Sequence, residues 1–154
     1  MIKVRGPSID DFREILALAT WFQENSPYFA DIPLEPRKVF DLLATSLLPD
    51  GAIFVNVTEK DGKIIGMFAG SVTEYFFSKE KIATDIALVF YPDSRKDIYG
   101  AMKQMVSNFE DWAKANGARE ICIANAAGLA GESLNKFLER QGYVPKGFIF
   151  KKGA

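Results

Sequence analysis

Apolar residues recur along this 154-residue chain with two different periods, and the periods predict its helices and strands. Spacings of three and four residues predict helices around 12–22, 39–47, 102–113 and 134–141. Alternating or continuous apolar runs between turn residues predict strands at 2–5, 52–58, 63–73, 83–91 and 120–124. The last apolar residues predict a terminal hairpin of strands 143–144 and 148–151 around Pro145-Lys146-Gly147.

The predicted order, β-α-α-β-β-β-α-β-α-β-β, indicates the fold class. Three consecutive strands in the middle of the chain argue against a doubly wound parallel sheet, which needs strands and helices to alternate. The segment Ile86–Phe90 is apolar at every position, as expected of a central strand that is covered on both faces. We therefore expect an α/β fold of the mixed α+β kind. Its sheet would be mixed but mostly antiparallel, with helices on both faces, in one domain over residues 1–154.

The chain has no histidine and a single cysteine, Cys122. These counts exclude a Ser-His-Asp triad, a Cys-His pair and an intrachain disulfide, and they leave too few of the usual zinc ligands. We expect no metal. Cys122 alternates into a predicted strand, and its simplest interpretation is a small buried apolar residue. Any catalysis must use carboxylates, hydroxyls, cations, backbone dipoles or a cosubstrate.

Nineteen basic and twenty acidic residues give a net charge of −1. This balance predicts neither a nucleic-acid partner nor a membrane surface partner, because it supplies no broad basic field. The longest apolar run is too short to span a bilayer, and residues 1–12 lack the apolar stretch of a signal peptide. We expect a cytoplasmic location.

The junction between the predicted strand 83–91 and the next helix is the richest local feature. A helix N-terminus offers unpaired N–H groups and a positive dipole end, which suit a pyrophosphate. Arg95 and Lys96 add charge, and Gly100 permits a close approach of the backbone. An ordinary junction with two surface cations fits the same residues. No P-loop or GxGxxG pattern is present.

This junction resembles the central block of the GCN5-related N-acetyltransferase (GNAT) superfamily, usually written V-x-P-x-x-R-G-x-G-x-G/A. Here the block reads LVFYPDSR, and a long helix NFEDWAKANGAREI follows it, similar to a phage-type subset of the family. The segment LNKFLERQGYVPKGFIFKK resembles the closing block. The resemblance implies the GNAT fold and transfer of an acetyl group from acetyl-CoA to a primary amine, directly within a ternary complex.

The same resemblance implies where acetyl-CoA would bind. Pantetheine would add to the central strand through the backbone of Leu88, Val89 and Phe90. The pyrophosphate would bind the N–H groups of Arg95, Lys96, Asp97, Ile98, Tyr99, Gly100 and Ala101. The chain departs from the family because Lys96 and Ile98 replace two loop glycines.

A second departure concerns the acid that protonates the leaving thiolate. Many family members carry a tyrosine four residues before the last glycine, and here that position is Leu138. The hydrocarbon side chain of Leu138 has no acidic proton to donate. Tyr91, Tyr99 or a water could replace the tyrosine, or transfer could proceed without it.

Two carboxylates are candidates for the general base. Asp85 lies on the predicted central strand and alternates with Ile86, so its side chain can face the cleft. The family often carries a glutamate near this position. Glu74, at the end of the preceding strand, is the second candidate. Either residue could instead be a strand-end carboxylate in solvent.

The acceptor would be a small-molecule or peptide amine, and the family usually shapes its site with the loop between the first two helices. Tyr28 and Phe29 lie in that loop. Tyr75 could add an aromatic wall, and Asn125 could bond to pantetheine or acceptor. Core or hairpin packing explains the aromatic residues equally well. Dimers are common in the family, so a homodimer is a possible state.

Two other functions remain open at this point. One is a GNAT-fold binding or interaction module without catalysis, which the replaced glycines and Leu138 favour. The other is an unrelated mixed α/β domain that acts through protein contacts.

Overall fold

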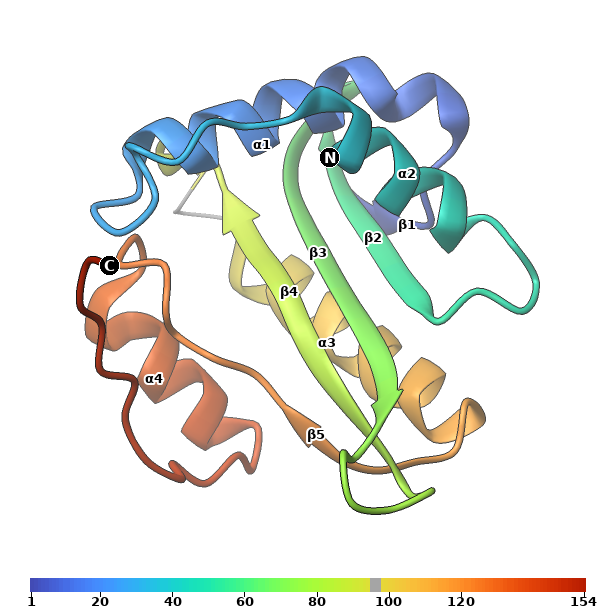
Figure 1. Cartoon of the computed structure of the whole chain (residues 1–154). Coiled ribbons are helices and arrows are strands. Elements are labelled where there is room, and N and C mark those ends of the chain that lie inside the picture. Colours follow the sequence, from blue (N-terminus) through green and yellow to red (C-terminus); the bar gives the residue numbers. More distant parts are fainter. Residues whose placement is uncertain (95–97) are drawn as a thin grey trace.

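A five-stranded sheet forms the middle layer of the computed structural model, which describes residues 1–94 and 98–154 (Figure 1). The strand order is β1-β2-β3-β4-β5. Successive strands pair antiparallel except β4 and β5, which are parallel. The strands are β1 (Ile2–Arg5), β2 (Ile53–Lys60), β3 (Lys63–Glu74), β4 (Lys81–Phe90) and β5 (Ala118–Cys122). The predicted mixed, mostly antiparallel sheet is confirmed.

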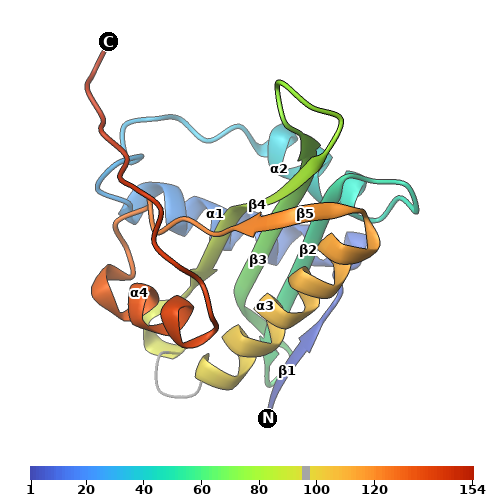
Figure 2. The same ribbon diagram turned by 90° about the horizontal axis from the view of Figure 1, so that it is seen from below.

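Helices cover both faces of the sheet, as predicted (Figure 2). The helices α1 and α2 lie on one face, and α3 lies on the other with α4 beside it. Their bounds are α1 (Phe12–Asn25), α2 (Pro36–Ser46), α3 (Ile98–Ala115) and α4 (Gly131–Arg140). Short 3-10 turns, Ile9–Asp11 and Pro92–Ser94, follow β1 and β4. None of the helices in the described ranges is long and apolar enough to cross a membrane.

Aromatic packing fixes α3 against the sheet. Phe109 is fully buried, and its ring centroid lies 4.8 Å from that of Phe68 and 5.3 Å from that of Phe54. A Cβ at Gly70 would come within 2.4 Å of the Phe109 ring, so this glycine lets the ring reach the strand. Truncating such a core phenylalanine to alanine costs about 3–5 kcal/mol.

The separation of β4 from β5 is the feature of the fold that creates the site. The two strands pair only through Lys81–Thr84 of β4, and beyond Thr84 they diverge (Figure 1). A β-bulge accompanies the divergence, because Ala69 pairs with Ala87 while Gly70 pairs with Asp85, which leaves Ile86 without a partner on β3. The carboxyl half of β4 therefore has an open edge in the described structure.

An ion-pair network ties β1 to β2 and to the turn before α1. Arg5 binds both carboxylate oxygens of Asp11, at 2.7 and 2.9 Å, and its Nε donates to Glu59 at 2.8 Å. Asp11 also accepts the N–H of Ser8 at 2.7 Å, which holds the turn before α1. The Arg5 guanidinium lowers the pKa of Asp11 below its ordinary value, chiefly through this hydrogen bond.

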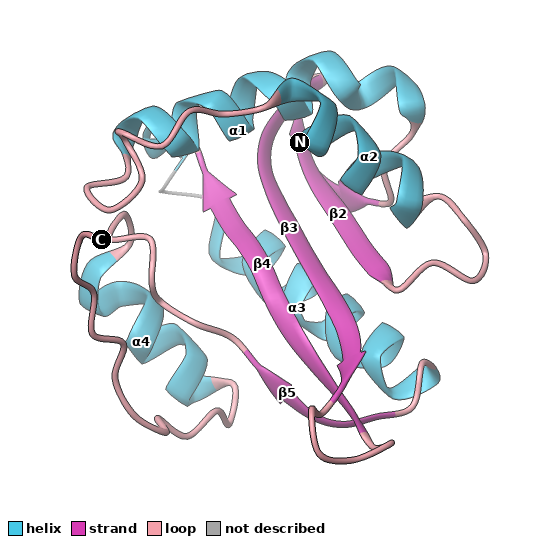
Figure 3. Cartoon of the chain, in the orientation of Figure 1, coloured by secondary structure: helices cyan, strands magenta, loops and turns pink. Residues whose placement is uncertain are grey.

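The predicted terminal hairpin is wrong. Residues 141–154 contain no strand, and Figure 3 shows the segment after α4 as loop throughout. Local contacts explain the difference. The Tyr143 hydroxyl donates to Glu110 of α3 at 2.9 Å, and its N–H donates to the Leu138 carbonyl, which holds the chain against the helices. Gly147 then takes a positive φ of 124°, and the tail runs toward the loop after α1.

Candidate active site

A hollow of about 210 Å³ lies where β4 and β5 separate. The strand β4 contributes residues 85–88 to its wall, and the segment after β5 contributes residues 124–127, 129 and 130. Phe22 and Phe29 close it from the α1 side, and Leu134 closes it from α4. Among the described residues that line this hollow, only Asp85 carries a titratable group, its carboxylate. The hollow is therefore a mostly apolar cleft with one candidate acid or base.

Asp85 lies at the fork between the two strands. Its Oδ1 accepts the N–H of Ala124 at 2.9 Å, so a side chain takes the role that a backbone carbonyl would have if the ladder continued. Burial raises the pKa of Asp85 above its ordinary value of 3.8, and the Ala124 hydrogen bond opposes this only in part. A carboxylate with a raised pKa is a stronger base than one in free solvent.

The open edge of β4 runs from the fork to the start of the α3 connection. The Tyr91 N–H donates to the Ile65 carbonyl at 2.9 Å, so the backbone groups of Tyr91 face β3. Since these directions alternate along an antiparallel ladder, the N–H and C=O groups of Leu88 and Phe90 face the open edge, whereas those of Val89 face β3. Leu88 and Phe90 can therefore hydrogen-bond an extended ligand.

The N-terminus of α3 follows this edge. Ile98, Tyr99, Gly100 and Ala101 form its first turn, where N–H groups lack partners within the helix. A Cβ added at Gly100 would meet no atom within 4 Å, so the turn is open to solvent at that point. The other three residues predicted for the pyrophosphate, Arg95, Lys96 and Asp97, lie outside the described residues.

The side chain at the position where relatives carry an acid tyrosine belongs to the core. Leu138 is buried and packs with Val106 and Phe137. Tyr99 lies nearby, since its ring meets the Phe137 ring edge-on at 5.5 Å. The other candidate, Tyr91, packs on Trp21 of α1 at 5.7 Å, and burial raises its pKa.

The loop after α1 reaches the hollow through Phe29. Gln23 fixes the loop by donating to the carbonyl of Phe29 at 3.1 Å and to that of Ala30 at 2.9 Å. Ser26 is fully buried, and its hydroxyl donates to the Ala127 carbonyl at 2.6 Å, which joins this loop to the segment after β5. Sequence reasoning missed Ser26, because no pattern distinguishes it from a surface serine at a helix end.

Two of the residues predicted for the acceptor, Tyr28 and Phe29, lie in this loop, and Phe29 and Asn125 line the hollow. The Asn125 side-chain amide donates to the Gly131 carbonyl at 2.7 Å and to Asn135 at 3.0 Å. Asn125 therefore fixes the start of α4 against the loop, and its carbonyl oxygen is the group left for a ligand.

Glu74 and Tyr75 are placed away from the hollow. Glu74 is exposed at the far end of β3, where its backbone lies opposite Lys81 in the ladder. It is four residues beyond Gly70, the residue opposite Asp85. The Tyr75 hydroxyl donates to Glu120, an interaction that raises the pKa of Tyr75 to about 12. Neither residue lines the hollow that contains Asp85.

Cys122 is exposed at the edge strand β5, so the expectation of a buried residue is wrong. Desolvation of its thiol, followed by the charges of Glu120 and Asp85, raises its pKa. The thiol is therefore not activated as a nucleophile. Over residues 1–94 and 98–154, no group of three or more Cys, Asp or Glu side chains could hold a metal ion.

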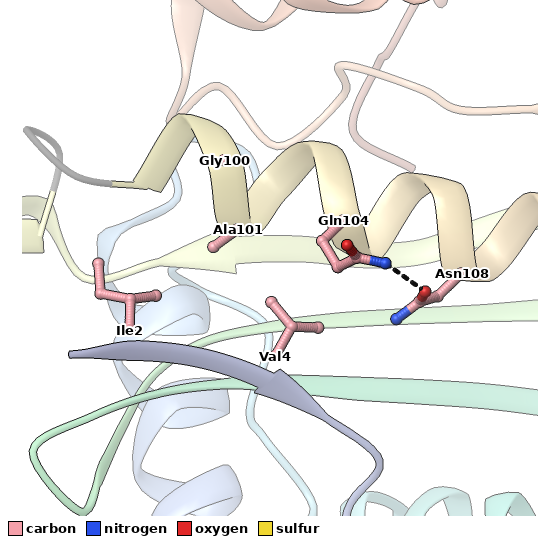
Figure 4. Close-up of a pocket in the computed structure, with 6 residues that line it drawn as sticks. All are labelled: Ile2, Val4, Gly100, Ala101, Gln104 and Asn108. Carbon is pink, nitrogen blue, oxygen red and sulfur yellow. Dashed lines mark hydrogen bonds between the residues drawn. The ribbon is translucent and has the colours of Figure 1, made fainter.

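A second hollow, of about 490 Å³, lies between β1 and α3 (Figure 4). Its six lining residues include no titratable group. Gln104 donates to Asn108 at 2.8 Å, and Asn108 donates to the buried Asn56 at 2.7 Å, so the amides bond to one another. The β1 edge lies three strands from β4, so this hollow is separate from the cleft of Asp85, although Gly100 and Ala101 of the first turn of α3 line it.

Comparison with known proteins agrees with this geometry. Residues 15–143 match the acetyltransferase (GNAT) family. The chain belongs to the GNAT acetyltransferase family. The separated strands β4 and β5, the bulge and the helix after β4 are thus features of a GNAT domain. No curated protein matches the sequence.

Solved structures share the GNAT fold at low identity. An aminoglycoside acetyltransferase from an uncultured soil metagenomic sample has a TM-score of 0.73 and 13% identity, over 100% of this chain and 99% of that one. A second one, in complex with sisomicin, has a TM-score of 0.71 and 15% identity, over 99% and 96% of the two chains. A ribosomal-protein-alanine N-acetyltransferase from Brucella melitensis biovar Abortus 2308 has a TM-score of 0.71 and 13% identity, over the whole of both chains.

Proposed function

We propose that this GNAT domain transfers an acetyl group from acetyl-CoA to a primary amine, with Asp85 as the general base. The observation that carries the proposal is the position of Asp85. Its carboxylate lines the cleft at the fork of β4 and β5, next to the open strand edge. Two structural neighbours are named an aminoglycoside acetyltransferase and a ribosomal-protein-alanine N-acetyltransferase, and these names support an amine acceptor.

The chain's own groups suit acetyl-CoA. Leu88 and Phe90 direct backbone N–H and C=O groups to the open edge, where the pantetheine amides can add like a short strand. The first turn of α3 supplies N–H groups and a positive dipole end for the pyrophosphate. Gly100 leaves room for that approach.

The reaction needs one carboxylate and one hydrogen-bond donor. The lone pair of the neutral amine attacks the thioester carbonyl carbon, so a C–N bond forms and the C–S bond breaks. The Leu88 N–H, which faces the open edge and belongs to the wall of the hollow that contains Asp85, polarises the carbonyl oxygen. Asp85 accepts the proton that the amine nitrogen loses, directly or through a water. The thiolate leaves with the C–S electron pair and takes a proton from a tyrosine or from water.

A second candidate function is a GNAT-fold module that binds acetyl-CoA without turnover. The specific observation in its favour is Leu138, an apolar residue buried in the core at the position where many relatives carry an acid.

Calorimetric titration with acetyl-CoA, followed by thiol release assays with amines, separates these functions. We expect binding in the micromolar range and thiol release with at least one of polyamines, amino acids, aminoglycosides and peptides. Binding without thiol release would favour the silent module. No binding at millimolar acetyl-CoA would contradict both functions.

A further inference from the structure

A lysine of the C-terminal tail lies on the loop that shapes the acceptor side of the cleft. The Lys151 ammonium donates to the backbone carbonyl of Tyr28. Its Nζ lies 5.1 Å from the centroid of the Phe29 ring and 5.8 Å from that of the Tyr28 ring. Figures 1 and 2 show the C-terminal tail passing beside the loop after α1. A carbonyl oxygen and two aromatic faces are the groups that bind an alkylammonium ion.

This ammonium contact adjoins the cleft of Asp85. Phe29 belongs to both, since it lines the hollow with Asp85 and also faces the Lys151 ammonium. Gln23 holds the backbone of Phe29, and Ser26 joins the loop to the segment after β5. The loop is therefore built before any ligand arrives, and its cation contact has a fixed position relative to the cleft.

The tail that carries Lys151 has little else to hold it. The apolar residues just before Lys151 are not packed: Phe148 is 91% exposed, Ile149 74% and Phe150 93%. Since the free energy of apolar packing depends on buried area, these residues contribute little to docking of the tail. An external ammonium group can replace Lys151 at the cost of few other contacts.

We propose that Tyr28 and Phe29 form a second ammonium subsite, which Lys151 fills in the free protein. The acceptor is then a diamine or polyamine, whose second cationic group displaces Lys151 from this subsite. The inference rests on the proposed function, because the other amine of the acceptor is the one acetylated at Asp85. Lys151 then acts as an internal competitor, which selects against acceptors that carry a single charge.

Thiol release with linear diamines of increasing length, compared with monoamines of equal length, tests this subsite. We expect the best diamine to exceed its monoamine about tenfold in kcat/KM, the ratio expected of about 1.4 kcal/mol of added binding. Lys151→Met should raise that ratio a further threefold or more, because a tethered competitor acts at millimolar effective concentration. Phe29→Leu, which removes the ring but keeps apolar volume, should lower the ratio.

Lys152→Met is the matched control, since it removes the same charge from the neighbouring residue. Equal ratios in Lys151→Met, Lys152→Met and the wild type would overturn the subsite. If no amine is acetylated, the proposed function fails, and titration of the diamines into the protein without acetyl-CoA decides the subsite by itself. Binding must then be tighter for Lys151→Met than for Lys152→Met, and equal affinities would refute the proposal.

Discussion

Asp85 makes a structural hydrogen bond in an environment that disfavours its charged form. Its carboxylate accepts the Ala124 N–H at the point where the β4–β5 ladder stops, but burial opposes its charge. The pKa of Asp85 is therefore higher in the folded state than the ordinary value of 3.8. At a pH between 3.8 and this raised pKa, the folded protein binds more protons than the unfolded chain. Stability from this group is therefore present at low pH and is lost as the pH rises through the raised pKa. At neutral pH the charge of Asp85 is a net cost to folding.

Replacement of Asp85 by Asn should separate function from stability. The Asn side chain keeps an oxygen for the Ala124 N–H and removes the buried charge. We expect kcat/KM to fall about 100-fold or more, the usual contribution of a general base. Unfolding in urea at pH 7 should show equal or greater stability, and acetyl-CoA affinity should not change. Unchanged turnover would show that Asp85 is not the base.

We propose Tyr99 as the acid that protonates the leaving thiolate. It lies in the first turn of α3, and its ring meets Phe137, the neighbour of Leu138 on α4. We expect Tyr99→Phe to lower kcat about tenfold or more, because an acid in reach of the leaving group contributes at least that much. Tyr91→Phe is the control, since Tyr91 packs on Trp21 at the α1 side. Equal rates for both variants would assign the proton to water.

Alternation along a single strand predicted that Asp85 can face the cleft, and the structure places it there, whereas its proposed role as base came also from the family resemblance. Contacts between distant segments were beyond such reasoning. The hydrogen bond from Ser26 to Ala127 and the approach of Lys151 to Tyr28 join parts of the chain about 100 residues apart or more. No local pattern encodes them. Glu74 was a plausible second base only because the register of β3 against β4 was unknown.

At the scale of elements, the glycine in the first turn of α3 affects both the stability of the helix and the binding of acetyl-CoA. Gly100 is a helical residue with free space around its Cα, and glycine in a helix costs about 0.5–1 kcal/mol relative to alanine. We expect Gly100→Ala to stabilise the fold by up to about this amount and to weaken acetyl-CoA binding about tenfold by crowding the pyrophosphate. Calorimetry and urea unfolding measure the two effects.

Ser107→Ala supplies the control for this helix, because Ser107 is exposed in the same element and lies two turns further along. It should leave acetyl-CoA affinity unchanged. An affinity for Gly100→Ala equal to that of the wild type would show that no ligand approaches the first turn of α3 closely.

Most elements could be predicted from periodicity, because each buries an apolar stripe or face against the sheet. The exception is the terminal hairpin. Phe148, Ile149 and Phe150 form a strong strand pattern, but a strand needs a partner edge, and Tyr143 and Gly147 direct the tail away from β5. The divergence of β4 and β5 beyond Thr84 was likewise not predicted from periodicity. Pairing is a property of two segments, whereas periodicity reports on one.

For the whole molecule, two carboxylates, the buried Asp11 and the partly buried Asp85, give stability opposite dependences on pH. Asp85 has a raised pKa, whereas the pKa of Asp11 is lowered by Arg5. For Asp11 the stabilising contribution is present above 3.8, the ordinary value, and is lost as the pH falls through the lower folded pKa. The network of Arg5, Asp11 and Glu59 joins the edge strand β1 to β2 and α1, so its loss affects the sheet as a whole.

Asp11→Asn should therefore reduce stability at neutral pH and have less effect in strong acid. We expect the free energy of unfolding to fall by about 1–3 kcal/mol at pH 7, because Arg5 loses a bidentate charged partner in a partly buried site. Urea unfolding at pH 7 and at pH 2–3 measures the difference from wild type at both ends of the titration. Asp10→Asn removes the same charge from the exposed neighbouring position and should change stability by about 0.5 kcal/mol or less. A difference between Asp11→Asn and wild type that stays constant from pH 7 into acid would mean that packing around Asp11, rather than its charge, holds β1 in place.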